Sequence, residues 1–151
     1  MKKISIVCFV AAFALIAVFS CNKDSNNLPT SNNDYLTAKP WITVHTWTKP
    51  AVDSPWSLID SIIPVCEWDN LLTFTTDHRF SINEGTIKCD TTKGASSILE
   101  SGTWSLQNNQ SILVVGTSLG SQTMSIEALN ASMLQVSYQD SSVYIREQYR
   151  H

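Results

Sequence analysis

From Trp41 onward the chain consists of short runs rich in Val, Ile, Thr and aromatic residues, with polar turn-forming residues about every ten positions. Runs of this length and spacing are typical of antiparallel β-structure. Their short connections favour an up-and-down meander that either closes into a barrel or folds into two packed sheets. Because closure removes exposed strand edges, we expect an eight-stranded antiparallel up-and-down β-barrel. The expected strands are Trp41 to Thr48, Asp69 to Thr76, Arg79 to Ile87, Glu100 to Gln107, Ile112 to Thr117, Gln122 to Leu129, Met133 to Gln139 and Val143 to Tyr149. Between the first two, Ser57 to Ile63 predicts a short helix or lid.

The first 20 residues have the pattern of an export signal. Lys2 and Lys3 precede an uncharged apolar run of sixteen residues, 4–19. As a helix with a rise of ~1.5 Å per residue, this run is too short to cross a hydrocarbon core of ~30 Å comfortably, so it is interpreted as a removable leader. Residues 18–21, Val-Phe-Ser-Cys, resemble the lipobox of bacterial lipoproteins. That resemblance implies cleavage before Cys21 and lipidation of its sulfur, palmitate being a suitable label; the alternative is an ordinary secretory peptide cut elsewhere.

The sequence therefore divides into a signal peptide (1–20), a lipidated cysteine with a flexible linker (21–39) and a β-barrel domain (40–151). Residues 22–34 are polar, lack aromatic side chains and cannot bury enough apolar surface to order themselves. Several acyl chains on Cys21 would hold the protein durably at a bilayer. The expected location is the cell envelope, at the outer membrane, on its periplasmic face or on the cell surface.

Charge and cysteine usage narrow the partners and the compartment. Without the leader, eight basic residues stand against thirteen acidic ones, a formal charge of −5, which lacks the basic footprint of a nucleic-acid-binding protein. Cys66 and Cys89 are the remaining thiols, and in an oxidising compartment we expect them to form a disulfide. Metal ligation is the weaker alternative, because no zinc-type spacing accompanies them. Closing a loop of about 23 residues is worth ~3 kcal/mol in the chain-entropy model.

Several short motifs occur in a recognisable order. A C-x-x-D-N-x-x-x-F segment spans 66–74, a turn follows at Asp77, then come Phe80, Gly85, Cys89 and the G-T-W triplet 102–104. This order resembles the lipocalin-like domain of small Bacteroidota lipoproteins, a calycin-like small β-barrel, over residues 40–150. His78 stands where that family commonly has Gly. The resemblance implies a lipocalin-like barrel whose interior is either filled by side chains or holds one small ligand; the short strands favour a filled or shallow interior.

Alternation along the strands predicts which side chains face the interior. Trp56, in a Pro-flanked loop, is expected to be exposed and available to a partner. The three histidines lie far apart and no G-x-S-x-G motif is present, so we expect no catalytic residues, no metal site and no cofactor. The inward-facing candidates for ligand binding are Phe74, Phe80, Trp104, Ile126, Val136 and Tyr138.

These observations favour a non-catalytic, monomeric cell-envelope lipoprotein. Its barrel would bind a small apolar ligand or, almost equally well supported, an envelope or host protein. One alternative is a protease inhibitor of the small β-barrel type, acting through an N-terminal segment at 22–40. Another is a structural surface subunit. A connected internal cavity would favour the ligand binder, whereas a filled barrel would favour the inhibitor.

Overall fold

The computed structural model describes residues 31–92 and 96–151. The expected signal peptide, the lipidation site Cys21 and residues 21–30 of the linker lie outside these residues. The helical elements are α1 (Asn32–Thr37) and the 3-10 turns η1 (Asp60–Ile62) and η2 (Val65–Glu67). The strands are β1 (Trp41–Lys49), β2 (Ser57–Leu58), β3 (Leu71–Phe74), β4 (Arg79–Asn83), β5 (Ile98–Gln107), β6 (Ile112–Thr117), β7 (Gly120–Leu129), β8 (Met133–Asp140) and β9 (Val143–Arg150).

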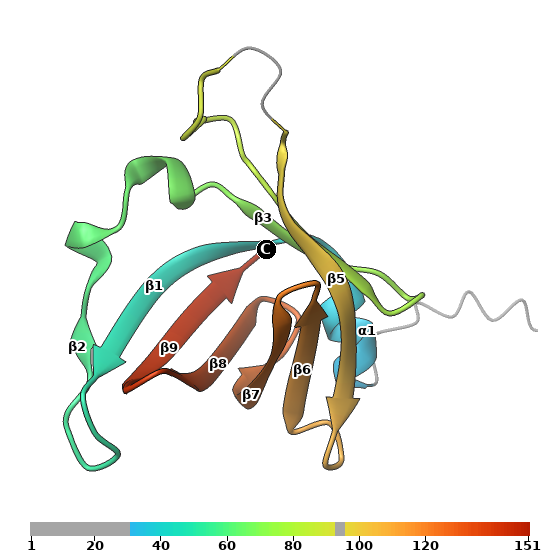
Figure 1. The fold of residues 1–151 in the computed structure, drawn as a ribbon. Helices are drawn as coiled ribbons and strands as arrows, with labels where there is room; N and C mark the ends of the chain where they lie inside the picture. The colour runs from blue at the N-terminus through green and yellow to red at the C-terminus, as the bar shows by residue number, and fades with distance from the viewer. Residues whose placement is uncertain (1–30, 93–95) are drawn as a thin grey trace, which may run out of the picture.

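Strands β3 to β9 follow one another as antiparallel neighbours, and β1 closes the sheet (Figure 1). One edge of β1 pairs with β9 from Ile42↔Arg150 to Lys49↔Tyr144. The other edge pairs with β3 at Trp41↔Leu72 and with β2 at Trp47↔Leu58. The molecule is therefore a closed eight-stranded antiparallel up-and-down barrel, as the sequence predicts, and β2 is a short addition to β1.

The β3–β4 hairpin is shorter than the sequence pattern predicts. Its ladder runs from Phe74↔Phe80 to Leu71↔Asn83, so residues 69–70 and 84–87 lie outside it. There the side chains of Asp69 and Asn70 accept hydrogen bonds from the backbone amides of Ile87 and Gly85 instead. In the turn, His78 adopts the left-handed conformation at φ 62°. This is the conformation for which glycine is usually chosen.

One end of the barrel, here called the floor, is closed by α1. The helix begins with a capping box, in which Ser31 Oγ accepts from the Asp34 amide and the Asp34 carboxylate accepts from the Ser31 amide at 3.1 Å. Leu36 on α1 and Trp41 on β1 are fully buried, and Trp41 Nε1 donates to the Leu36 carbonyl at 3.0 Å. The flexible linker expected up to residue 39 therefore ends earlier, because a capping box and one apolar anchor suffice to order residues 32–37 against the barrel.

The two ends of the domain meet at this floor. The His151 ring stacks on Trp41 with ring centroids 3.7 Å apart, and His151 Nδ1 lies 3.0 Å from the Pro40 carbonyl oxygen. The buried apolar side chains form one core cluster that begins at this point. They are Leu36, Trp41, Phe74, Phe80, Trp104, Leu113, Leu134 and Val136.

The opposite end, here called the mouth, is where β1 ends and β9 begins. The segment expected to form a helix or lid, 57–63, supplies β2 and η1; η2 follows it, and the chain then continues into β3, in green in Figure 1. Asp60 attaches it to β1: one carboxylate oxygen lies 2.7 Å from His45 Nδ1 and the other accepts from the Thr46 amide at 2.9 Å. In the described part of the chain, no helix has the length and apolar character needed to cross a bilayer.

The floor predicts a specific effect on stability. Replacing Leu36 by Ala should lower the free energy of unfolding by about 3 kcal/mol, because it opens a cavity beneath Trp41 that the barrel cannot collapse to fill. Leu119→Ala is the matched control, since that leucine is 97% exposed in the β6–β7 turn. Urea unfolding followed by circular dichroism measures both. Equal effects of the two substitutions would contradict a structural role for α1.

Candidate functional site

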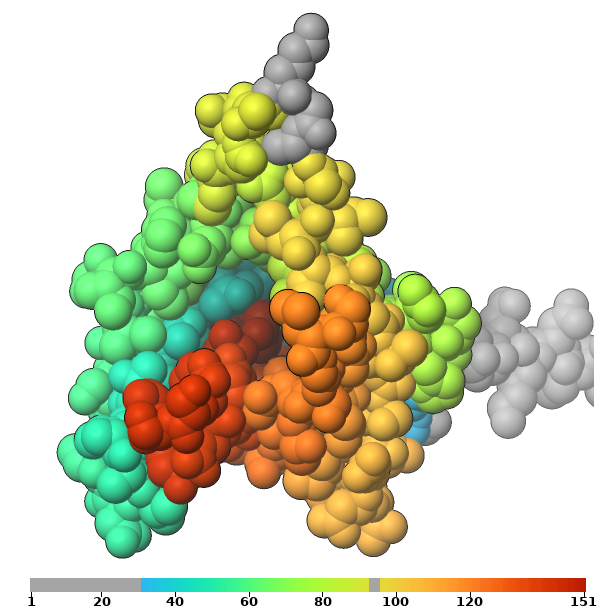
Figure 2. Space-filling view, viewed as in Figure 1, coloured from blue at the N-terminus to red at the C-terminus, as the bar shows by residue number. Residues whose placement is uncertain are grey.

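The barrel contains a cavity of about 340 Å³. Figure 2 shows the surface hollowed between the red β9 and the orange β6–β7 hairpin. The interior is thus filled at the floor and hollow above it, which fits the shallow interior expected from the sequence. The walls come from seven strands, β3 to β9, and consist of Leu72, Phe74, Phe80, Ile82, Glu100, Leu113, Val115, Gln122, Met124, Leu134, Val136, Tyr138, Glu147 and Tyr149.

Four of the six ligand-binding candidates lie on this wall: Phe74, Phe80, Val136 and Tyr138. Trp104 belongs to the floor instead. Its ring meets Phe74 edge-on at 5.6 Å between centroids, and its Nε1 donates to the Thr75 carbonyl at 3.1 Å. Ile126 is partly buried against the core, away from the cavity wall. The alternation along a strand predicts which side chains face inward. Whether an inward-facing side chain reaches the cavity depends on its height along the barrel.

The cavity wall carries an acidic group that sequence reasoning missed. Tyr149 donates its hydroxyl to Glu147 Oε2 at 2.7 Å, and Tyr138 also hydrogen-bonds to this carboxyl. Burial raises the pKa of Glu147 above its ordinary value, although the hydrogen bonds from the two tyrosines oppose the shift. Burial and the nearby carboxyl likewise raise the pKa values of Tyr149 and Tyr138, so both hydroxyls remain protonated donors. This position could have been found from the sequence. Glu147 follows Ile145 by two residues on β9, and the alternation of side chains along a strand places both on the inner face.

The charged side chains that line the cavity are all acidic. Glu147 lies in the interior and Glu100, an exposed residue of β5, lies at its rim. Among the described residues that line the cavity, none is Lys, Arg or His. A ligand in this space therefore meets apolar surface, aromatic rings and acidic oxygens.

A second recess of about 190 Å³ adjoins the cavity under the η1–η2 segment. It shares Leu72, Ile82, Glu147 and Tyr149 with the cavity and adds polar wall residues from β1 and from the chain after η2. Burial acts to raise the pKa of Asp60, but the hydrogen bonds from His45 and Thr46 outweigh it and lower that pKa. The charged Asp60 carboxylate therefore attaches the η1–η2 segment to β1.

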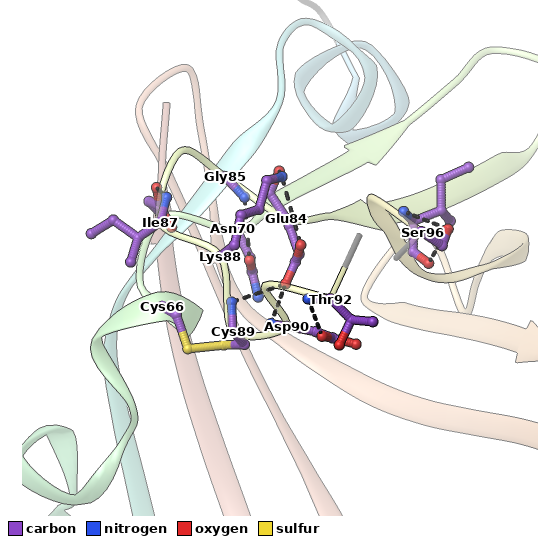
Figure 3. Close-up of polar contacts among 12 residues, drawn as sticks. Cys66, Asn70, Glu84, Gly85, Ile87, Lys88, Cys89, Asp90, Thr92 and Ser96 are labelled. Atoms are coloured by element: carbon purple, nitrogen blue, oxygen red, sulfur yellow. Dashed lines mark hydrogen bonds and ion pairs between the residues drawn. A yellow bond between two sulfur atoms is a disulfide. The ribbon is translucent and has the colours of Figure 1, made fainter. Parts of the chain in front are cut away.

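The predicted disulfide is confirmed, with Cys66 and Cys89 joined and their Cα atoms 5.2 Å apart (Figure 3). It links η2 to the loop after β4. Glu84, itself buried, accepts from the Cys89 amide at 3.1 Å inside that loop. Asp69 Oδ2 accepts from the Ile87 amide at 2.9 Å. The C-x-x-D-N segment thus holds the wall of the mouth in place through the disulfide and these hydrogen bonds.

Gly85 shows how tightly this wall is packed. A Cβ atom at that position would lie 2.1 Å from the Asp69 carbonyl oxygen, so no larger residue fits without movement of the backbone. Within residues 31–92 and 96–151, no three His, Cys, Asp or Glu side chains gather into a metal-binding group. The expectations of no enzymatic activity and no cofactor stay predictions.

Trp56 lies on the outer wall and is less accessible than predicted. It is partly buried, with the Arg146 guanidinium 4.3 Å and the Lys49 ammonium 4.7 Å from its ring centroid. Arg146 also forms an ion pair with Glu127, with 2.7 Å between Nε and Oε2. Two cations cover the indole because its electron-rich face attracts them. The prediction of a freely exposed tryptophan is therefore wrong, and its role in binding a partner stays a prediction.

Comparisons with known proteins find structural similarity alone. No protein-family model matches the chain, and a search of the curated proteins returns no match. A search of solved structures finds the bovine lipocalin allergen Bos d 2, which is 16% identical; the match covers 78% of this chain and 73% of that one, with a TM-score of 0.41. The barrel assignment rests on the strand pairing described above.

The raised pKa of Glu147 predicts how stability depends on pH. The folded barrel keeps this proton at pH values where the unfolded chain, with an ordinary pKa of 4.5, has released it. This group therefore makes the free energy of unfolding fall as pH rises from 4.5 through the raised pKa. Glu147→Gln cannot ionise and should remove that part of the decline in urea unfolding at a series of pH values. Glu100→Gln, the control at the rim, should retain it; parallel curves for wild type and Glu147→Gln would refute the assignment.

Proposed function

We propose that this protein is a non-catalytic cell-envelope lipoprotein that binds one small, largely apolar molecule inside its barrel. The observation that carries the proposal is the cavity of about 340 Å³, whose wall is predominantly aliphatic and aromatic. Binding sites for small molecules are typically concave and apolar, with a few polar groups that orient the ligand. The Glu147–Tyr149 pair supplies such groups here.

The cavity is closed at the floor and open toward the mouth. Leu36 and Trp41 seal the floor, so a ligand reaches the interior from the mouth. In the described part of the chain, the most exposed large apolar side chains lie on loops or strand ends around that mouth. They are Val52, Leu58, Ile62, Val65, Ile87, Ile98, Leu99, Leu119 and Val143. An apolar rim of this kind suits passage of an apolar molecule, and it would equally contact an envelope or host protein that delivers or receives it.

Two observations weigh against the protease-inhibitor alternative. The barrel contains a cavity, whereas that alternative expects a filled one. In addition, residues 32–37 of the proposed inhibitory segment form α1, and Leu36 is fully buried in the floor. That part of the segment would have to leave the core before it could enter a protease cleft.

Ligand binding can be tested with a cavity-filling substitution. Octanol should bind the full chain in a calorimetric titration, and Met124→Trp should weaken binding at least about tenfold because the larger ring occupies the cavity. Thr123→Trp is the matched control, because it adds the same ring one residue earlier on β7. Thr123 is exposed and lies on the outer surface of the barrel, in a depression that Trp56 also lines. Absence of octanol binding, or equal effects of the two substitutions, would overturn the proposal.

The lipid anchor is the second part of the proposal. The lipobox-like residues 18–21 support lipidation of Cys21, and a linker of about ten residues would separate that cysteine from α1. In bacteria fed labelled palmitate, the wild-type chain should carry the label and stay with the membranes, and Cys21→Ser should do neither. Cys8→Ser, a change within the leader, is the control and should behave as wild type. Equal labelling of wild type and Cys21→Ser would remove the anchor.

A further inference from the structure

We infer that the ligand of this barrel is a small lipophilic amine, and that Glu147 holds its ammonium group inside the cavity. The inference rests on the proposed function, because it names the chemical class that the same cavity accepts. Three independent features of the cavity carry it: the position of the carboxyl group, the absence of a basic partner among the residues that line it, and the aromatic rings around it.

The carboxyl group stands where a ligand can reach it. Glu147 lies on both the cavity wall and the wall of the adjoining recess, so its side chain meets free space on two sides. Tyr149 occupies one acceptor position of Oε2 at 2.7 Å, and Tyr138 occupies a second position on the same carboxyl group. A carboxylate has about four such positions, so the group retains acceptor capacity toward the cavity. An ammonium group offers three donors and matches that capacity.

The charges around Glu147 favour a cation over every other headgroup. The groups that face it are the hydroxyls of Tyr138 on β8 and Tyr149 on β9, with Glu100 on β5 across the cavity and Glu67 of η2 across the recess. From β1, its register partner is Thr46. These neighbours are neutral or acidic. A fatty acid or phosphate would therefore enter against like charge, and a neutral ligand would leave Glu147 either protonated or uncompensated.

The rings near the carboxyl group extend the match. Tyr138, Tyr149, Phe74 and Phe80 all line the cavity. Aromatic faces attract organic cations electrostatically, most strongly where water is excluded. The aliphatic wall residues then receive the apolar part of the ligand. The arrangement is that of a carboxylate at the side of an apolar chamber, which suits a primary amine with a short hydrocarbon body.

Proton linkage follows from this assignment. The carboxyl group of the empty barrel holds its proton to a higher pH than an exposed glutamate, because burial raises its pKa. An ammonium ion beside it stabilises the ionised form, so binding of the amine expels the proton between the lowered and the raised pKa values. The affinity for an amine should therefore rise with pH until Glu147 is ionised in the free protein, whereas the affinity for an alcohol should not.

The test compares three probes of one chain length on the full chain: octylamine, octanol and octanoate. Titration calorimetry should show octylamine binding about tenfold or more tightly than octanol, and octanoate more weakly than either. In buffers of different ionisation enthalpy, octylamine alone should release a proton from the protein. Glu147→Gln should reduce the preference for octylamine over octanol to about one, and circular dichroism of the variant shows whether it is folded. Glu100→Gln, the matched control at the rim, should keep most of the preference.

The outcomes separate this inference from the proposed function. If octanol binds but octylamine binds no better, or if no proton is released, the amine assignment is wrong and the binding cavity stands. If Glu100→Gln removes the preference and Glu147→Gln does not, the counter-charge is misassigned and the inference fails. If none of the three probes binds, both the inference and the proposed function are overturned. Should Glu147→Gln not fold, proton release by the wild-type chain decides the question.

Discussion

The structure depends on the pairing of its first and last barrel strands. β1 bonds to β9 from Ile42↔Arg150 to Lys49↔Tyr144, and this seam converts a linear meander into a barrel without free edges along its length. Closure creates an interior, and only a closed interior can contain a buried floor, a cavity and a carboxyl group shielded from water. The stacking of His151 on Trp41 secures the same seam at the floor.

The barrel is divided by how its inward side chains are used. Near the floor, Leu36 and Trp41 complete a close-packed core, and the stabilisation that comes from excluding water is concentrated there. Toward the mouth, the wall residues surround space rather than one another. The disulfide and the Asp69–Ile87 hydrogen bond hold the loops of the mouth in place. Core and cavity share Phe74, Phe80, Leu113, Leu134 and Val136, so the same side chains stabilise the fold and form the wall of the site.

The buried carboxyl group of Glu147 lowers the stability of the empty barrel. An acid inside an apolar chamber destabilises the fold once it ionises, since its charge loses hydration. The two tyrosine hydroxyls relieve part of that cost, and Glu147 still retains acceptor capacity toward free space. A group that costs stability in the empty protein acquires a physical rationale if a ligand compensates it. This reasoning connects the energetics of folding to the class of molecule proposed here.

Much of the architecture could be predicted from local pattern. Alternation and turn residues located all eight barrel strands, because both depend on near neighbours along the chain. The pairing of Cys66 with Cys89 followed from there being two thiols outside the leader segment and the lipobox-like cysteine. The order of α1 and the covered state of Trp56 could not be predicted, since Leu36 is buried by distant strands and Arg146 approaches Trp56 from β9.

The same division holds for the candidate site. Parity along β3, β4 and β8 by itself determined that Phe74, Phe80, Val136 and Tyr138 face inward. Only the tertiary structure decided that Trp104 lies in the floor and that Glu147 borders open space. The physical reason is that facing inward is a property of a single strand, whereas a cavity depends on the height and size of side chains contributed by seven strands at once.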